Sequence, residues 1–288
     1  MLAKTERFRK VSPEKQMKKI STIILDIDGT IMNSEGRISS ATLKALRRCS
    51  AKGIELYVAT ARPSRLVFRN NEVEGDATFL IEKGAFYNGA VAFDKPLDFY
   101  RHRPISAQLV QPTIDVLLET NTDLQIALQF EDDNHSFRLP MREQEVAQWG
   151  FSEDELLPFE LAVKRDCSKI VAYHDSLSLS GACHNLTRKY GDCLNIFLSD
   201  SDRWILVTAC NANKEIALLD LISQRGLQPE NAVVFGDDTP DAGMFKVFGR
   251  SVAMGNASNT LKKIATDITL SNDENGVAYA LENILKLI

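Results

Sequence analysis

The sequence predicts an α/β protein in which helices cover a parallel sheet and a separate α+β segment is inserted between the two halves of that sheet. Strand-like and helix-like segments alternate over residues 22–93 and again over residues 213–287. Alternation of this kind is typical of β-α-β units with parallel strands. Residues 92–209 do not follow it, and a segment of this length is large enough to form a domain of its own.

We therefore expect the chain to have three parts. They are a basic N-terminal extension at 1–19, a core that combines 20–91 with 210–288, and an inserted domain at 92–209. In the extension only Glu6 and Glu14 oppose the lysines and arginines. A charge run of this kind is more often a solvated tail than a binding arm.

The core begins with a strand at 22–27, an apolar run, and Ser39 or Ser40 can cap the helix that follows it. Gly53 is placed to end that helix. The other elements expected in the core are strands at 54–60, within 78–93, at 232–238, at the start of 251–265 and at 267–271, and helices at 213–226, late in 251–265 and at 276–287. The elements expected in the insert are helices at 104–120 and 177–190 and strands at 124–130, 169–174, 194–199 and 203–209.

Composition excludes several classes of protein. The net charge of -5 and the pI near 5.5 argue against a nucleic-acid-binding protein, which usually has a basic domain. No stretch is long and apolar enough to cross a membrane, and the N-terminus lacks the apolar segment of a secretion signal. The five cysteines form no C-x-x-C pair, which is most simply explained by free thiols in a cytoplasmic protein.

Polar side chains gather where the predicted strands end. Asp26 and Asp28 end the first strand and Thr60 ends the second, while Lys214 opens a late helix. A further acidic group, Asp237, Asp238 and Asp241, follows the strand at 232–235. Because ligands of open α/β sheets bind beyond the carboxyl ends of the strands, all of these groups can converge on one rim. Carboxylates, a hydroxyl and an ammonium together are suited to Mg²⁺ and phosphate.

Such a pair of acids also has a chemical use. A carboxylate at Asp26 can attack phosphorus and form an aspartyl-phosphate. Asp28, two residues on, can protonate the leaving oxygen and later take a proton from water. Gly29 permits a tight backbone turn beside the phosphate. On their own the two acids can also be turn residues, as Asp-Gly often is.

Four motifs in order carry a family resemblance. "DIDGT" (26–30), "VATARP" (58–63), "NKEIAL" (213–218) and "GDDTPDAGM" (236–244) resemble the motifs of the haloacid dehalogenase-like phosphatases. "YNGAVAFD" (87–94), "VAMGNAS" (252–258) and "SNDENGVA" (271–278) resemble the Cof-type subfamily. The resemblance implies a Rossmann-like core with a large α/β cap inserted after the second motif, where 92–209 lies; the cap itself matches only in size and place.

The resemblance implies a role for each matched residue. Asp26 is expected to be the nucleophile and a Mg²⁺ ligand, and Asp28 the general acid and base with its backbone carbonyl on the metal. Asp237 is expected to bind the metal directly, and Asp241 through water or a second layer of contacts. The residues expected to hold the substrate phosphate are Ile27 and Gly29 through their backbone amides, Ala61 in the same way, and the side chains of Thr60 and Lys214.

Two residues depart from the family pattern. Ala61 stands where the second motif usually has Gly, and Pro240 where the fourth motif usually has Asn, whose side-chain amide helps to hold phosphate. Proline has no such donor. The leading interpretation is a cytoplasmic Mg²⁺-dependent phosphatase for a small phosphorylated metabolite, either a sugar phosphate or a phosphorylated cofactor. The alternatives are a phosphomutase or phosphotransferase, and a phosphate-binding regulatory protein without turnover.

Overall fold

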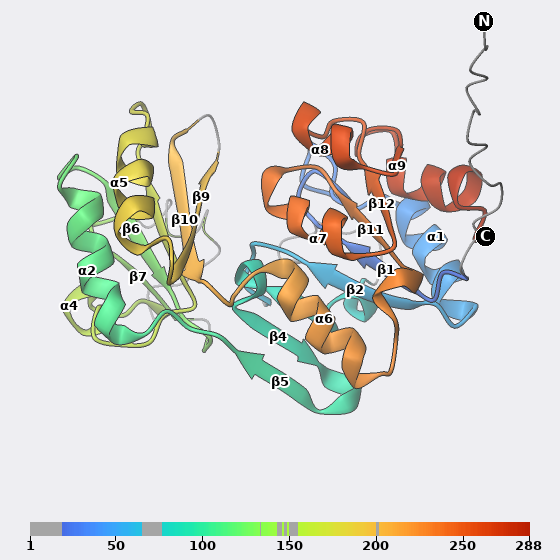
Figure 1. Ribbon diagram of the computed structural model, residues 1–288, viewed down its shortest axis with the longest axis horizontal. Coiled ribbons are helices and arrows are strands. Elements are labelled where there is room, and N and C mark those ends of the chain that lie inside the picture. Colours follow the sequence, from blue (N-terminus) through green and yellow to red (C-terminus); the bar gives the residue numbers. More distant parts are fainter. Residues whose placement is uncertain are drawn as a thin grey trace, which may run out of the picture.

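The computed structural model describes residues 19–64, 77–132, 134–142, 146, 149, 155–199 and 202–288. The chain forms two lobes, a core and a cap, and it passes between them twice, once after β5 and once after β10 (Figure 1). The predicted basic extension at 1–19 lies outside the described residues except for Lys19. None of the described helices is long and apolar enough to cross a membrane.

The core contains an eight-stranded sheet with β1 near its middle. Its order is β13 (Asp267–Ile268), β12 (Arg250–Ala253), β11 (Ala232–Gly236), β1 (Thr22–Leu25), β2 (Glu55–Ala59), β3 (Lys83–Phe86), β4 (Val91–Asp94) and β5 (Phe99–His102). The strands from β13 to β3 are parallel to one another, while β4 pairs antiparallel with both β3 and β5. Every residue of β1 is buried, as expected of a central strand covered on both faces.

Helices cover this sheet. They are α1 (Ser40–Ala51), α6 (Lys214–Gln224), α7 (Ala242–Val247), α8 (Asn259–Ile264) and α9 (Gly276–Tyr279), and α9 continues as a π-helical turn at Ala280–Ile284. Short 3₁₀ turns lie at Thr78–Leu80, Tyr87–Gly89, Lys95–Leu97, Pro229–Asn231 and Thr239–Asp241. The predicted cap of the first helix is confirmed at Ser39, whose side chain accepts a hydrogen bond of 3.2 Å from the amide of Thr42. Asn213 caps α6 in the same way and thereby fixes where Lys214 begins that helix.

The boundary of the insert differs from the expectation. Residue 92 lies inside β4, and the pairing of β3 with β4 and of β4 with β5 assigns residues 92–102 to the core sheet. The cap therefore begins only after His102. The cause is a hairpin: the chain turns back at 95–98 and adds two antiparallel strands to the sheet before it leaves. At the other boundary β10 ends at Ala209.

The cap is a five-stranded antiparallel sheet with helices on one face. Its order is β7 (His135–Phe137), β6 (Gln125–Gln129), β8 (Lys169–Tyr173), β10 (Trp204–Ala209) and β9 (Leu194–Ser199). Its helices are α2 (Ala107–Leu118), α4 (Phe159–Ala162) and α5 (Ser180–Tyr190). Pro112 lies inside α2, in its second turn.

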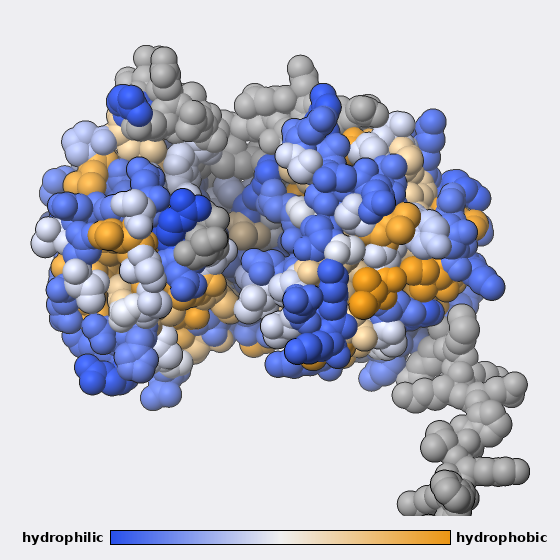
Figure 2. Space-filling view, turned by 90° about the horizontal axis from the view of Figure 1, so that it is seen from above, coloured by the Kyte–Doolittle hydropathy of each residue, from blue (hydrophilic) through white to orange (hydrophobic). Residues whose placement is uncertain are grey.

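The two faces of the cap sheet carry different side chains, because successive residues of a strand point to opposite faces. Ile170 and Ala172 of β8 are fully buried, on the face that packs against α2 and α5. Lys169, Val171 and Tyr173 belong to the opposite face, which we call the open face. At one end the open face meets the core, since Nζ of Lys169 donates to the carbonyl of Ala61 over 3.2 Å. Seen from above, the surface is hollowed between the two lobes (Figure 2).

Candidate active site

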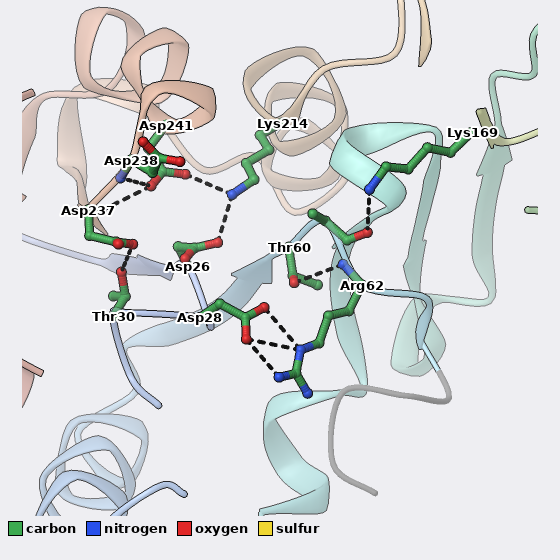
Figure 3. A network of polar contacts seen from close by, with 11 residues as sticks. Asp26, Asp28, Thr30, Thr60, Arg62, Lys169, Lys214, Asp237, Asp238 and Asp241 are labelled. Atoms are coloured by element: carbon green, nitrogen blue, oxygen red, sulfur yellow. Dashed lines mark hydrogen bonds and ion pairs between the residues drawn. The ribbon is translucent and has the colours of Figure 1, made fainter. Parts of the chain in front are cut away.

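The predicted rim is present at the carboxyl ends of three neighbouring core strands. Asp26 directly follows β1, Thr60 follows β2, and Asp237 follows β11. Lys214, the first residue of α6, reaches the same place from above the sheet (Figure 3). Parallel pairing of β1 with β2 and with β11 brings these ends together, although the residues are far apart in the sequence.

A buried ammonium links two of the acids. Nζ of Lys214 lies 2.7 Å from Oδ1 of Asp26 and 2.7 Å from Oδ1 of Asp241. All three side chains are at least nine-tenths buried. Burial alone would lower the pKa of Lys214, but Asp241 and Asp26 outweigh it and raise that pKa well above its ordinary value. Lys214 is therefore a fixed positive charge beside Asp26.

The acids outnumber this lysine. Asp26, Asp237 and Asp241 each offer an oxygen atom, and the three atoms lie within 4.8 Å of one another. Burial raises the pKa of Asp26 well above its ordinary value, with Lys214 opposing the rise and the neighbouring acids adding to it. Burial, together with the charge of Asp241, likewise raises the pKa of Asp237 to about 7. Two buried carboxylates and one half-buried carboxylate with one ammonium fit a hard divalent cation, because such a cation prefers oxygen ligands and removes the repulsion.

The turn after β1 fits closely against Asp237. Oγ1 of Thr30 donates to Oδ1 of Asp237 over 3.1 Å. Gly29 has a φ of +71°, and a β-carbon at that position would collide with the carboxylate of Asp237. Nδ2 of Asn256 donates a hydrogen bond of 2.8 Å to the carbonyl of Gly29. Glycine is thus required at this position both by its backbone conformation and by the space available.

Asp28 does not join the acidic cluster. Its side chain is 54 % exposed and forms a bidentate pair with Arg62, with Nη2 of Arg62 at 2.7 Å from Oδ1 and Nε at 2.9 Å from Oδ2. A pair this exposed is weakly held. The structure therefore keeps the second acid of the motif separate from the first, on the open side of the rim (Figure 3).

The expected phosphate-binding residues surround the rim. Thr60 is fully buried, and its Oγ1 accepts a hydrogen bond of 3.1 Å from the amide of Arg62. The side chain of Ile27 is buried in the core, and its carbonyl accepts from the amides of Thr30 and Met32. Ala61 presents its carbonyl to Lys169. The contacts of Ile27 and Thr60 stabilise their own loops, and the contact of Ala61 with Lys169 joins the loop after β2 to the cap.

Two basic residues of the site have no role in the sequence analysis. Lys169, from β8 of the cap, is nine-tenths buried at the edge of the core site. Burial, together with the charge of Lys214, lowers its pKa to about 8, and the charge of Asp28 opposes the change. Arg62 is the partner of Asp28. A lysine opening an otherwise apolar strand, and an arginine within the second motif, are the signals that could indicate them.

The loop that carries Pro240 is shaped by its acids. Asp238 and Asp241 form a reciprocal capping box around the turn at Thr239–Asp241. Oδ2 of Asp241 accepts from the amides of Asp237 at 3.0 Å and of Asp238 at 3.3 Å. One oxygen of Asp241 thus holds the loop while the other contacts Lys214. Pro240 occupies an early position of the turn, where its fixed φ is tolerated.

Comparisons with known proteins identify similar chains. A family model described as haloacid dehalogenase-like hydrolase matches residues 23–281. The chain is 27% identical to "Phosphatase YwpJ" of Bacillus subtilis, over 91% of this chain and 99% of that protein. It is 26% identical to "5-amino-6-(5-phospho-D-ribitylamino)uracil phosphatase YcsE" of the same organism, over 92% and 95%. The solved structure of a haloacid dehalogenase-like hydrolase from Bacteroides thetaiotaomicron aligns with a TM-score of 0.75, at 26% identity over 92% of this chain and 100% of that one.

Proposed function

The chain belongs to the haloacid dehalogenase-like hydrolases, and we propose that it is a Mg²⁺-dependent phosphatase that hydrolyses small phosphorylated metabolites. We propose sugar phosphates or phosphorylated cofactors as its substrates. The observation that carries the proposal is the position of Asp26, a buried carboxylate at the end of β1 that is held by Lys214 and faces Asp237 and Asp241.

The first chemical step is assigned to Asp26 and Asp28. A carboxylate oxygen of Asp26 attacks phosphorus, the bond from phosphorus to the ester oxygen breaks, and an aspartyl-phosphate forms. Asp28 gives its proton to the departing oxygen, which leaves as an alcohol. Because Asp28 pairs with Arg62 in this structure, it has to separate from Arg62 to act as an acid. The exposure of the pair makes that separation inexpensive.

The second step returns the enzyme to its starting state. Water attacks phosphorus, Asp28 takes a proton from that water, and the bond between phosphorus and Asp26 breaks to release inorganic phosphate. Lys214 and Thr60 hold phosphate oxygens during both steps, together with the backbone of the turn at Ile27 and Gly29 and the amide of Ala61. Lys214 also keeps Asp26 aligned, since its Nζ contacts Oδ1 of that residue at 2.7 Å.

We propose that Asp26 and Asp237 bind Mg²⁺ directly, with the backbone carbonyl of Asp28, and that Asp241 acts through water. When bound, Mg²⁺ neutralises charge on the transferring phosphoryl group and lets Asp26 approach it. The oxygen-only donor set supports a hard cation and not zinc. Asp241 is suited to the outer role because Lys214 and the amides of its own loop already occupy both of its oxygens.

The proposal is tested with a panel of phosphorylated metabolites in the presence of Mg²⁺. We expect release of inorganic phosphate and of the free alcohol, and mass spectrometry of acid-quenched enzyme should find a phosphoryl group on the peptide that contains Asp26. A substrate that is converted to a phosphorylated isomer would identify a mutase instead. Absence of both turnover and the phosphorylated peptide would favour a binding protein without activity.

A further inference from the structure

The open face of the cap carries a pocket at the end away from the core. The pocket has a volume of about 740 Å³, which is in the range of sites for small organic ligands. Its walls include Trp149, Tyr173 and Trp204, and its edge includes Asp123, His174 and Asp175. None of these residues takes part in the proposed chemistry.

Two aromatic rings of the pocket lie nearly parallel to each other, and a third is tilted relative to both. Tyr173 and Trp204 are directly paired across β8 and β10, and their rings stack with centroids 4.6 Å apart and an angle of 11°. Trp149 lies 5.8 Å from each of them, at 33° to Tyr173 and 29° to Trp204. All three rings are only half-buried, so part of their surface stays accessible, and aromatic rings favour offset stacking with another flat ring. A cage for a quaternary ammonium group would instead need aromatic walls at steep angles to each other.

The polar groups at the edge of the pocket determine which hydrogen-bonding groups a bound ring should carry. The side chains of Asp123 and Asp175 are exposed and accept hydrogen bonds. Nδ1 of His174 accepts from the amides of Ser176 and Leu177, so its Nε2 carries the proton of the neutral ring and can donate. Together they suit a ring with both N–H and C=O groups. The two carboxylates also repel phosphate, so the phosphate of a ligand belongs elsewhere.

The register of β8 relates the pocket to the active site. Lys169 and Tyr173 lie on the same face of this strand, and Lys169 contacts Ala61 at the edge of the core site. Four residues along a strand span about 13 Å. The open face thus has a cationic end beside the phosphate site and an aromatic, acid-rimmed end about 13 Å further on.

From this arrangement we infer that the pocket holds a planar heteroaromatic ring of the substrate, an inference that rests on the proposed phosphatase function. The ring carries N–H and C=O groups and is joined to the phosphate by an extended chain, such as a polyol. The phosphate is bound by the core and the ring by the cap, so closure of the cap on the core places the ester bond between them.

Fluorescence offers a direct test, because the only two tryptophans of the chain are Trp149 and Trp204, and both line the pocket. Uridine, which has a suitable ring but no phosphate, should quench their emission in a saturable manner. Tyr173→Leu leaves both tryptophans in place and should weaken uridine binding at least about fivefold, the lower end for loss of one stacked base. Tyr173→Phe keeps the ring and should bind as the wild type does. Tyr279→Leu removes an exposed aromatic residue of the core and serves as the control.

Kinetics then show whether the ring belongs to the substrate. Tyr173→Leu should raise KM for riboflavin 5′-phosphate at least about fivefold and leave KM for ribose 5-phosphate unchanged. No quenching by uridine, or quenching by choline in its place, would overturn the inference. Uridine binding with equal effects on the two esters would overturn its assignment to the substrate. The titration needs no turnover, so its result stands apart from that of the phosphatase test.

Discussion

The rim of the core and the open face of the cap differ in where their charged side chains lie. At the rim three carboxylates, Asp26, Asp237 and Asp241, are crowded around the single ammonium of Lys214. At the far end of the cap face the contacts are between uncharged, half-buried rings, and the acids remain exposed. Repulsion between charges is therefore concentrated at the rim, where we propose that the reaction takes place. A site that only binds a ring does not need crowded charges.

Lys169 is where the two regions meet. It belongs to a cap strand, but it is buried against the backbone of the second motif and lies within the field of Lys214 and Asp28. If the contrast between the regions holds, substitutions at the rim should reduce activity on every substrate, and substitutions at the aromatic end should reduce activity on only some substrates. Substitutions at Lys169 should affect the contact between the core and the cap.

The largest expected effect is at the nucleophile. Asp26→Asn removes the attacking oxygen's charge and should lower kcat by at least ~10³-fold for every phosphate ester, as other losses of a nucleophile do. Steady-state phosphate release with several esters measures this. Asp98→Asn is a matched control, because Asp98 lies in the hairpin turn with a φ of 49°, which asparagine tolerates. Activity near the wild-type value in Asp26→Asn would contradict the assignment.

The next effect concerns the cation. Chelation should reduce activity by at least about 100-fold, and Mg²⁺ should restore it. Mg²⁺ should also raise the unfolding temperature, since a ligand present at 100 times its Kd adds about 2.7 kcal/mol of stability. Asp237→Asn should lose most of this rise while remaining folded without metal, because it removes one of the repelling charges. Calorimetry with and without Mg²⁺ measures the unfolding temperatures of both proteins. If Mg²⁺ raised the unfolding temperature of Asp237→Asn as much as that of the wild type, Asp237 would not be a metal ligand.

The core site could be predicted because its residues depend on local patterns. Asp26 and Thr60 each follow a strand whose apolar sequence is plain, and in a parallel sheet these strand ends share one edge. The order of the four motifs then assigns Lys214 and Asp237 to the same rim. What this pattern does not indicate is the partner of Asp28: its side chain is expected to act as an acid and base and only its backbone carbonyl to bind the metal, and the structure shows that side chain paired with Arg62.

The cap could not be predicted to the same depth. The strand at 169–174 is expected from its apolar residues, and the structure confirms it as β8. Its partners and the face it turns to the core depend on pairing with β6 and β10, which are distant in sequence. The role of Lys169 therefore follows only from the assembled sheet. The same limit explains the misplaced start of the insert, since the antiparallel pairing of β4 and β5 is not visible in their composition.

An intermediate effect is expected at Lys169. Its pKa is about 8 in the folded chain and 10.5 as an ordinary lysine, so burial of the charged form costs stability. This cost is fully present below pH 8 and disappears as the pH rises to 10.5, where the unfolded chain also loses the proton. Lys169→Met should be more stable than the wild type by about 2 kcal/mol at pH 7, allowing for the lost hydrogen bond to Ala61.

Denaturant unfolding of both proteins between pH 7 and 10.5 measures this difference. The two stabilities should converge as the pH rises. Lys169→Arg keeps the charge and is the control, which should gain no stability at pH 7. A Lys169→Met variant that is less stable than the wild type at pH 7 would show that the contact with Ala61 outweighs the cost of burial.

The smallest expected effect is at Pro240, where the fourth motif departs from the family pattern. Lys214 already uses two of its three N–H groups on Asp26 and Asp241, so one remains for phosphate. An asparagine at position 240 would restore a donor, and a hydrogen bond to a charged group contributes roughly 1.5–3 kcal/mol. Pro240→Asn should therefore tighten inhibition by inorganic phosphate about tenfold, the lower end of that range. Because the proline fits its turn, the variant should also lose about 0.4–1 kcal/mol of stability.

The competing outcome for Pro240 follows from the capping box. Asp238 and Asp241 already define the turn, but without the fixed φ of proline the loop gains freedom, and Asp237 at its start can move away from the metal. The Mg²⁺ concentration needed for half-maximal activity separates the two cases. Tighter phosphate inhibition with an unchanged Mg²⁺ requirement supports a lost contact. Equal or weaker inhibition refutes it, and a raised Mg²⁺ requirement beside it would show that proline serves to keep Asp237 in place.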